Sequence, residues 1–233
     1  MAGPVRVGWA GACFPVVPGA ANFSGWCWAA TSADLVGYES WVELSHLMRL
    51  DAEPEVCGLV SQPFRLSWRC DGRSRRVSHT PDYFVRRRDG RVVVLDVRPD
   101  ELVEPEDAAK FAATAVACAR VGWDYERVGV LGPVLAANLR WLSGYRHPRV
   151  RRGPVADRLR GVFAQHQGLL AGARTVGDPI AVLPVLFHLL WCRELAVDLV
   201  GERLSAATVV RLAPAATGEV GSDADASAAS VAG

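Results

Sequence analysis

Residues 78–99 read SHTPDYFVRRRDGRVVVLDVRP and carry the clearest fold signal in the chain. Two runs rich in β-branched and aromatic residues flank Asp89-Gly90, a dipeptide typical of tight hairpin turns. The stretch therefore predicts an antiparallel hairpin. Its first strand opens at Pro81-Asp82, and its second strand closes at Asp96-Val97-Arg98.

The length of the turn decides whether the two strand aspartates face each other. A two-residue turn would pair Asp82 with Val97 and place Asp82 and Asp96 on opposite faces. A three-residue loop over Arg88–Gly90, with the glycine in the left-handed region, pairs Asp82 with Asp96. The alternation of apolar and polar residues favours the longer loop, because it gathers the apolar side chains on one face.

Two facing carboxylates repel each other unless a positive charge lies between them. A divalent cation or an arginine can fill that role, and metal-dependent phosphodiester hydrolysis uses such an arrangement of carboxylates. At this point an ordinary hairpin with solvated aspartates stays open as the alternative, because short patterns often match by chance.

Positive charge is concentrated locally, although the net charge of the chain is only +1. Residues 65–98 contain ten arginines and four aspartates, and residues 140–160 contain seven arginines with Asp157 as the one acid. Such patches attract polyanions, including nucleic acids. Lys110 is the only lysine, so a general bias toward arginine explains the number of arginines but not their clustering.

The cysteines and the most apolar segment exclude several classes of protein. The six cysteines show no C-x-x-C pair or His/Cys ligand spacing, so no zinc site is expected. Without a convincing signal peptide, they are expected to be reduced thiols of a cytoplasmic protein. The segment 180–191 is too short to span a membrane and contains Pro184, so it predicts a buried helix.

Hydrophobic periodicity predicts helices and strands in mixed order along the first 150 residues. Helices are expected at 38–50, at 104–121 and from 138 to 145; strands are expected at 56–60, 64–68 and 125–130, besides the hairpin. Core-facing side chains are expected at Trp41, Leu44 and Met48 in the first helix, and at Phe111 and Val116 in the second. The order predicts an α/β fold, a mixed sheet flanked by helices.

Composition divides the chain into four parts. An irregular arm with a possible short strand near Trp26–Ala30 is expected over 1–36, the α/β domain over 37–150, a small helical domain over 151–212 and a disordered tail over 213–233. The helical domain has predicted helices near 155–165 and 178–195. A possible hairpin of 196–199 with 208–212 follows them, which makes this domain winged-helix-like.

Several spaced motifs occur in one order over about residues 20–212. They are NFSGWCWAAT from Asn22, VGYESWVE from Val36, SQPFRLSW from Ser61, HTPDYFV from His79, VVVLDVRP from Val92, ANLRWLSGYRHPR from Ala137 and GDPIAVLPVLFHLLW from Gly177. With these motifs the chain resembles the TnsA-like family of heteromeric transposase endonuclease subunits, in its actinobacterial form.

The resemblance implies a restriction-endonuclease-like PD-(D/E)XK fold for the first domain. It implies a nuclease that uses Mg²⁺ or Mn²⁺ and cuts double-stranded DNA at the 5′ ends of a transposon, while a separate DDE-type transposase cuts the 3′ ends. It also implies an ATPase regulator as a partner, in part through the C-terminal domain. No association with a membrane is expected.

The family motifs also imply site residues. Glu43 takes the place of the helical acid, with Glu39 as the fallback, and Asp82 that of the central metal ligand. Asp96 stands where the family pattern has Glu or Gln, and it completes the expected ligand set of Glu43, Asp82 and Asp96. Arg98 stands where the pattern has lysine.

Arg98 is the main departure from the family pattern. Arginine keeps its charge at any usable pH and cannot exchange a proton as lysine does, although it can hold a phosphate. The substitution is compatible with hydrolysis by a metal-bound hydroxide and equally with a weakened enzyme. Lys110 on the following helix is a second candidate cation, although an exposed helical lysine is the favoured interpretation of it. Gln62 is expected to support the site.

Arginines near the hairpin are expected to contact the DNA backbone without reading its sequence. These residues are Arg73, Arg75, Arg76, Arg86, Arg87 and Arg88. A plain solvated loop is the alternative for the last three. His79 is expected near the DNA. Other functions remain open: an inactive DNA-binding or partner-binding subunit of the same machinery, another PD-(D/E)XK restriction or repair nuclease, or an interaction scaffold.

Overall fold

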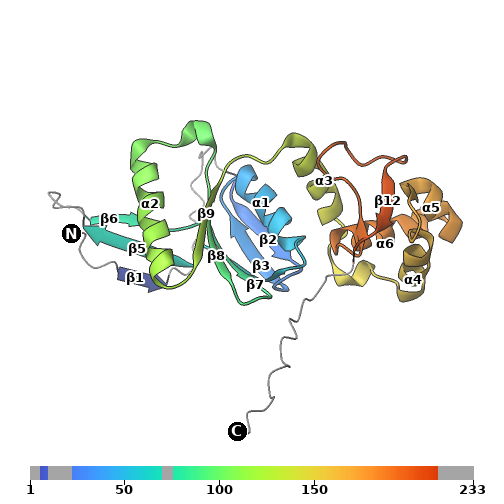
Figure 1. The fold of residues 1–233 in the computed structure, drawn as a ribbon, viewed down its shortest axis with the longest axis horizontal. Helices are drawn as coiled ribbons and strands as arrows, with labels where there is room; N and C mark the ends of the chain where they lie inside the picture. Colours follow the sequence, from blue (N-terminus) through green and yellow to red (C-terminus); the bar gives the residue numbers. More distant parts are fainter. Residues whose placement is uncertain (1–5, 10–22, 70–75, 215–233) are drawn as a thin grey trace, which may run out of the picture.

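The computed structural model describes residues 6–9, 23–69 and 76–214. Within these ranges the protein is α/β with a mixed sheet, as the sequence predicts, and it has six α-helices. Figure 1 shows strands β1 to β9 with α1 and α2 in one half of the molecule, and helices α4 to α6 with strand β12 in the other.

The central sheet has the strand order β4-β7-β8-β9. Strand β7 pairs antiparallel with both β4 and β8, whereas β9 lies parallel to β8. The four strands span Val56–Ser61, Tyr83–Arg87, Val92–Val97 and Asp124–Val128. The chain passes from β8 to β9 through α2, Pro105–Arg120, which provides the crossover that a parallel pair needs.

The β7–β8 hairpin adopts the register that the alternation predicts. Tyr83 pairs with Leu95 and Val85 with Val93, and one further step in this register sets Asp82 opposite Asp96. The loop is closed by the N–H of Gly90, which donates to the carbonyl of Arg87 at 3.1 Å. Gly90 has a φ of 85°, the left-handed conformation that glycine adopts without steric cost.

Helix α1, Trp41–Asp51, covers one face of the central sheet. Leu44, Leu47 and Leu50 are buried there, and Leu44 and Leu47 share a core with the odd-numbered side chains of β7 and β8. The expected stripe is wrong at Trp41, which is 49% exposed and stacks on the ring of Phe23 at the start of the helix.

Helix α2 covers part of the opposite face, where Val94 and Cys118 are buried with residues of β5. Thr114 is also buried, while Val116 is 54% exposed, so the expected core position at Val116 is wrong. The buried stripe of α2 runs through Thr114 and Cys118, which are spaced one turn apart.

Strands, not an irregular arm, occupy the described parts of residues 1–36. Strand β2, Gly25–Ala29, pairs with β3, Asp34–Tyr38, and β1, Arg6–Trp9, pairs with β5, Phe64–Arg69. Strand β5 also pairs with β6, Arg76–His79. Strand β2 agrees with the short strand expected near Trp26–Ala30, and it needs Gly25, because a Cβ there would lie 2.6 Å from the hydroxyl of Tyr38.

Four helices and a small sheet form the C-terminal half. The helices are α3, Pro133–Ser143; α4, Gly153–Val162; α5, Leu169–Val176; and α6, Pro179–Trp191. The sheet has the order β10-β12-β11, with strands Gln167–Gly168, Val209–Leu212 and Leu195–Ala196. This sheet includes the expected C-terminal hairpin, but helix α5 was not predicted.

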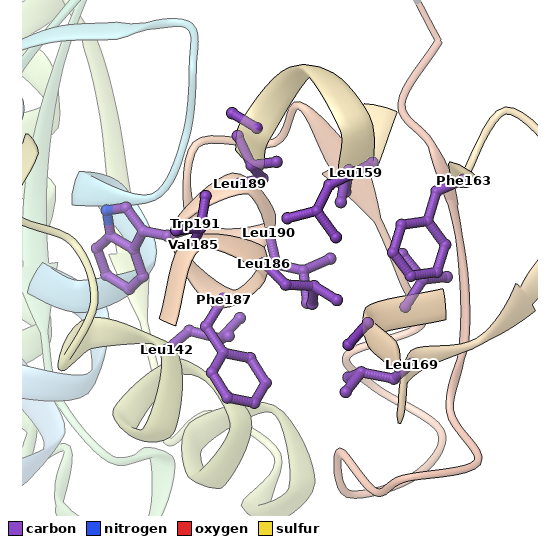
Figure 2. Packing of buried hydrophobic residues seen from close by; sticks show 14 of the residues in the cluster. Leu142, Leu159, Phe163, Leu169, Val185, Leu186, Phe187, Leu189, Leu190 and Trp191 are labelled. Atoms are coloured by element: carbon purple, nitrogen blue, oxygen red, sulfur yellow. The ribbon is translucent and has the colours of Figure 1, made fainter. Parts of the chain in front are cut away.

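Figure 2 shows side chains of α3 to α6 converging on one core, among them Leu142, Leu159, Leu169 and Leu186. This core includes Ala52 at the end of α1 as well as α3, which the composition change near 145–154 assigned to the first domain. The C-terminal core thus includes α3, because the apolar side of α3 packs on α6. The expected tail lies outside the described residues from 215 onward.

Among the described helices, none is by itself long and apolar enough to cross a membrane. Helices α5 and α6 reach that length only together, and they are bent by 120° at the break between them.

Candidate active-site cleft

A cleft of about 370 Å³ opens where β7 begins and β8 ends. The N-terminus of α1 and the first half of α2 form its other walls. The cleft brings together five of the residues predicted from the sequence: Glu39, Glu43, Asp82, Asp96 and Arg98. Among the other residues that line it are His79, Asp107 and Phe111, which the sequence did not assign to the site.

The start of α1 fixes Glu43 in the cleft. Ser40 is the N-cap residue, and its Oγ accepts from the N–H of Glu43 at 3.1 Å and donates to Glu43 Oε1 at 2.8 Å. Glu43 Oε2 accepts from the N–H of Glu39 at 2.7 Å. This is a capping-box arrangement, which satisfies the free N–H groups of the first turn. Burial raises the pKa of Glu43 despite these bonds.

Asp82 lies at the entrance of β7. Its backbone N–H donates to the carbonyl of Leu95 at 3.1 Å, and its Oδ2 accepts from the N–H of Val97 at 2.7 Å. Burial, followed by the nearby charge of Glu43, raises the pKa of Asp82 well above its ordinary value. The cleft thus holds like charges close together at a cost in free energy, which is common at functional sites.

Gln62 connects the two acidic walls. Its backbone N–H donates to the carbonyl of Asp82 at 2.8 Å, and its side-chain Nε2 donates to Glu39 Oε1 at 2.8 Å. Gln62 has a φ of 46°, a strained conformation for a residue with a side chain. The contacts place Gln62 where a supporting residue was expected.

Asp96 is held by two side chains that the sequence did not connect with it. The carboxylate is 2% exposed; its Oδ2 accepts from the hydroxyl of Tyr125 at 2.7 Å, and His79 Nε2 lies 2.9 Å from both oxygens. The ring of Phe111 packs edge-on against His79. Burial and the charge of Asp96 together raise the pKa of Tyr125.

Arg98 is paired with the wall of the cleft. Its Nη2 lies 3.2 Å from Asp107 Oδ2, and its Nε donates to the carbonyl of Leu102 at 3.2 Å. Lys110, which does not line the cleft, donates to Asp107 Oδ1 at 2.9 Å. The bond from Lys110 is the largest cause of the lowered pKa of Asp107. Asp107 thus bridges the two candidate cations, a role that sequence reasoning missed.

The arginines of the hairpin turn lie away from the acids. Residues 86–88 follow Asp82 by four to six positions, roughly 13–20 Å along an extended strand. None of these three lines the cleft; Arg87 lies 3.9 Å from Glu53, and Arg88 donates to the carbonyl of Pro54. Arg76 is exposed at the start of β6, while Arg73 and Arg75 lie outside the described residues.

The carboxylate oxygens of the cleft are suitable ligands for a hard divalent cation, because Mg²⁺ and similar ions take oxygen ligands. A cation would also offset the mutual repulsion that contributes to the raised pKa values of Asp82 and Glu43. In the described part of the chain, no three Asp, Glu, His or Cys side chains converge as a ready-made metal site. The carboxylates are instead engaged with Ser40, Val97, His79 and Tyr125.

Fold and site together define an α/β protein with an acidic cleft at the open end of a β-hairpin. No protein-family model and no curated protein matches the chain.

Proposed function

We propose that this protein is a metal-dependent DNA endonuclease, the TnsA-like subunit of a heteromeric transposase, and that it hydrolyses phosphodiester bonds at the 5′ ends of a transposon. The observation that carries the proposal is the meeting of Glu43, Asp82 and Asp96 in one cleft. These acids come from a helix and two strands, and they are the ones that the family motifs single out.

The arrangement of elements supports a restriction-endonuclease-like core. A helix bearing an acid, an antiparallel hairpin, and a parallel strand reached through a second helix follow one another, with the acids at one end of the hairpin. In the C-terminal half, the helices with the small β10-β12-β11 sheet support a winged-helix-like domain. That domain is the proposed contact for the ATPase regulator.

The proposed site assigns a role to each lining residue. Asp82, Glu43 and Asp96 would hold Mg²⁺ or Mn²⁺, with Glu39 beside them, and the ion when bound supplies a water of lowered pKa. Arg98 would leave Asp107 and hold the scissile phosphate. The Arg98 side chain is 44% exposed, so this exchange requires little unpacking.

The charge of the cleft limits how DNA can be held. Five of its lining residues are acidic, so the DNA backbone must be gripped by positive charge beside the cleft. The exposed arginines at 76, 86 and 88 and the basic run 140–160 are proposed for this grip and for salt-sensitive binding of double-stranded DNA. Selection of the transposon ends is assigned to the DDE-type transposase. The proposed location is the cytoplasm.

A second candidate function is a catalytically weakened subunit that binds DNA and partners. The pairing of Arg98 with Asp107 favours it, because this cation is already paired and cannot exchange a proton.

Nicking of supercoiled plasmid by the wild type and Arg98→Lys, with and without the transposase and the ATPase, separates the two functions. If the protein is an active endonuclease, the wild type nicks the plasmid in Mg²⁺ or Mn²⁺, and the partners increase the rate of nicking. If it is a weakened subunit, the wild type binds DNA in a salt-sensitive manner without nicking it, and only the Arg98→Lys variant nicks the plasmid. No nicking by either protein with the partners present contradicts the endonuclease proposal.

A further inference from the structure

His79 occupies an unusual position on the carboxylate of Asp96. Its Nε2 lies 2.9 Å from Oδ1 and 2.9 Å from Oδ2. An ionised carboxylate only accepts hydrogen bonds, so the Nε2–H of His79 is shared between the two oxygens. That is the place on a carboxylate where a bidentate cation binds.

Tyr125 binds the same carboxylate differently. Its hydroxyl donates to Oδ2 at 2.7 Å, and Tyr125 is not among the residues that line the cleft. His79 does line the cleft, at the end of β6, an edge strand of its sheet. Tyr125 therefore binds Asp96 from within the protein, whereas His79 binds it on the side of the cleft, from which a cation would arrive.

We propose that His79 competes with a divalent cation for Asp96. The proposal rests on the proposed function of the cleft, and it adds that the His79–Asp96 contact and a cation on Asp96 exclude each other.

The competition predicts whether a substitution at His79 raises or lowers the affinity of the site for a divalent cation. Removing the imidazole removes the competitor, and a hydrogen bond to a charged group of this kind corresponds to on the order of tenfold in affinity. A residue that merely oriented Asp96 as a ligand would have the opposite effect, because its loss would leave the carboxylate misplaced and weaken cation binding.

The test is a titration of the full chain with Mn²⁺ at one fixed pH, with free Mn²⁺ followed by electron paramagnetic resonance. We expect His79→Ala to bind Mn²⁺ on the order of tenfold more tightly than the wild type. Tyr125→Phe is the matched control, which removes the hydrogen bond of Tyr125 but no competitor and should bind no more tightly. His79→Asn provides a second variant if His79→Ala fails to fold, and it should also bind more tightly.

The outcomes separate this inference from the proposed function. Equal or weaker binding by the folded His79 variants overturns the competition but leaves the metal site intact. If neither the wild type nor the His79 variants bind Mn²⁺ in a manner that Asp82→Ala reduces, the proposed function fails and the inference fails with it.

Discussion

At the scale of single residues, the cleft places charge where it costs the fold stability. Asp82 sits beside Glu43 with Asp96 nearby, and burial, followed by the charge of Glu43, raises the pKa of Asp82. Asp96, by contrast, is deeply buried but receives bonds from Tyr125 and His79. The charge of Asp82 therefore lowers the stability of the fold, whereas the bonds of Asp96 raise it. Substitution by asparagine should change the stability in opposite directions at the two positions.

Asp82→Asn should stabilise the protein at neutral pH by about 1 kcal/mol or more, since one pKa unit corresponds to about 1.4 kcal/mol. The amide keeps an oxygen for the N–H of Val97. Because the folded pKa lies above the ordinary 3.8, folded Asp82 binds more protons than unfolded Asp82 between those two values. Wild-type stability is therefore lost as the pH rises through that window.

Urea unfolding at several pH values checks this expectation. The advantage of Asp82→Asn should be close to zero below the ordinary pKa and should grow as the pH rises. An advantage that is independent of pH, or a loss of stability at neutral pH, contradicts the account.

Asp96→Asn should destabilise the protein by about 1–3 kcal/mol, because one side-chain oxygen is replaced by an amide that faces donors. His79 and Tyr125 would then compete for the remaining acceptor. Urea unfolding of Asp96→Asn and of Asp82→Asn compares their free energies of unfolding. If both substitutions stabilise the protein, the hydrogen bonds of Asp96 contribute little to its stability.

At the scale of elements, the hairpin was predictable because its signals are local. The alternation of residues 83–97 and the turn at Asp89-Gly90 select one register, and that register sets Asp82 opposite Asp96. The pairing of β9 beside β8 depends on packing across α2, so the sequence could not connect Tyr125 with Asp96. The sequence indicated a strand near Trp26–Ala30, but its pairing with β3 was missed, because Val36 and Tyr38 of β3 are buried only through packing in the core that includes α1.

Gly90→Ala should cost about 1 kcal/mol, because a side chain is disfavoured at the left-handed φ of 85° although nothing lies within 4 Å of its Cβ position. Gly90→Asn is the matched variant and should lose less, since asparagine tolerates this conformation. Thermal unfolding of the two variants measures the difference. Equal losses would show that the cost is not one of backbone conformation.

The first turn of α1 is a second local device. Ser40→Ala removes the cap that binds the N–H and the carboxylate of Glu43, and it should cost about 1 kcal/mol. Ser40→Asp should recover the cap but add a charge beside Glu39 and Glu43, so it should be less stable than the wild type. Chemical unfolding ranks the three proteins; wild-type stability in Ser40→Ala would contradict the capping role.

At the scale of the whole molecule, α1 joins two cores. Leu44 and Leu47 pack on the central sheet, Ala52 belongs to the C-terminal core, and Met48 packs against both. Arg146 adds a polar link, donating to the carbonyls of Trp28 and Ser143. Composition placed a boundary near residues 145–154 because the sequence becomes basic there. The start of the C-terminal core is set instead by the apolar packing of α3, which only the folded chain reveals.

Shared packing on α1 predicts that the two halves unfold together. Leu186→Ala, in the middle of the C-terminal core, should cost about 2–5 kcal/mol and should shift the unfolding of both halves. Ile180→Ala, on the same helix but 85% exposed, should change stability little. Urea unfolding followed by tryptophan fluorescence and by circular dichroism tests this, and an early separate transition in Leu186→Ala would show independent halves.

The central claim is that the acids of the cleft cut DNA, and the most direct test is nicking of supercoiled plasmid in Mg²⁺ and Mn²⁺, with the transposase and ATPase partners supplied. Three proteins are compared: the wild type, Asp82→Asn in the cleft, and Asp89→Asn at the turn of the same hairpin. Asparagine before Gly90 suits that turn, so Asp89→Asn controls for the loss of one carboxylate. The account predicts metal-dependent nicking by the wild type and Asp89→Asn and none by the stably folded Asp82→Asn. Nicking by Asp82→Asn at the wild-type rate would contradict it.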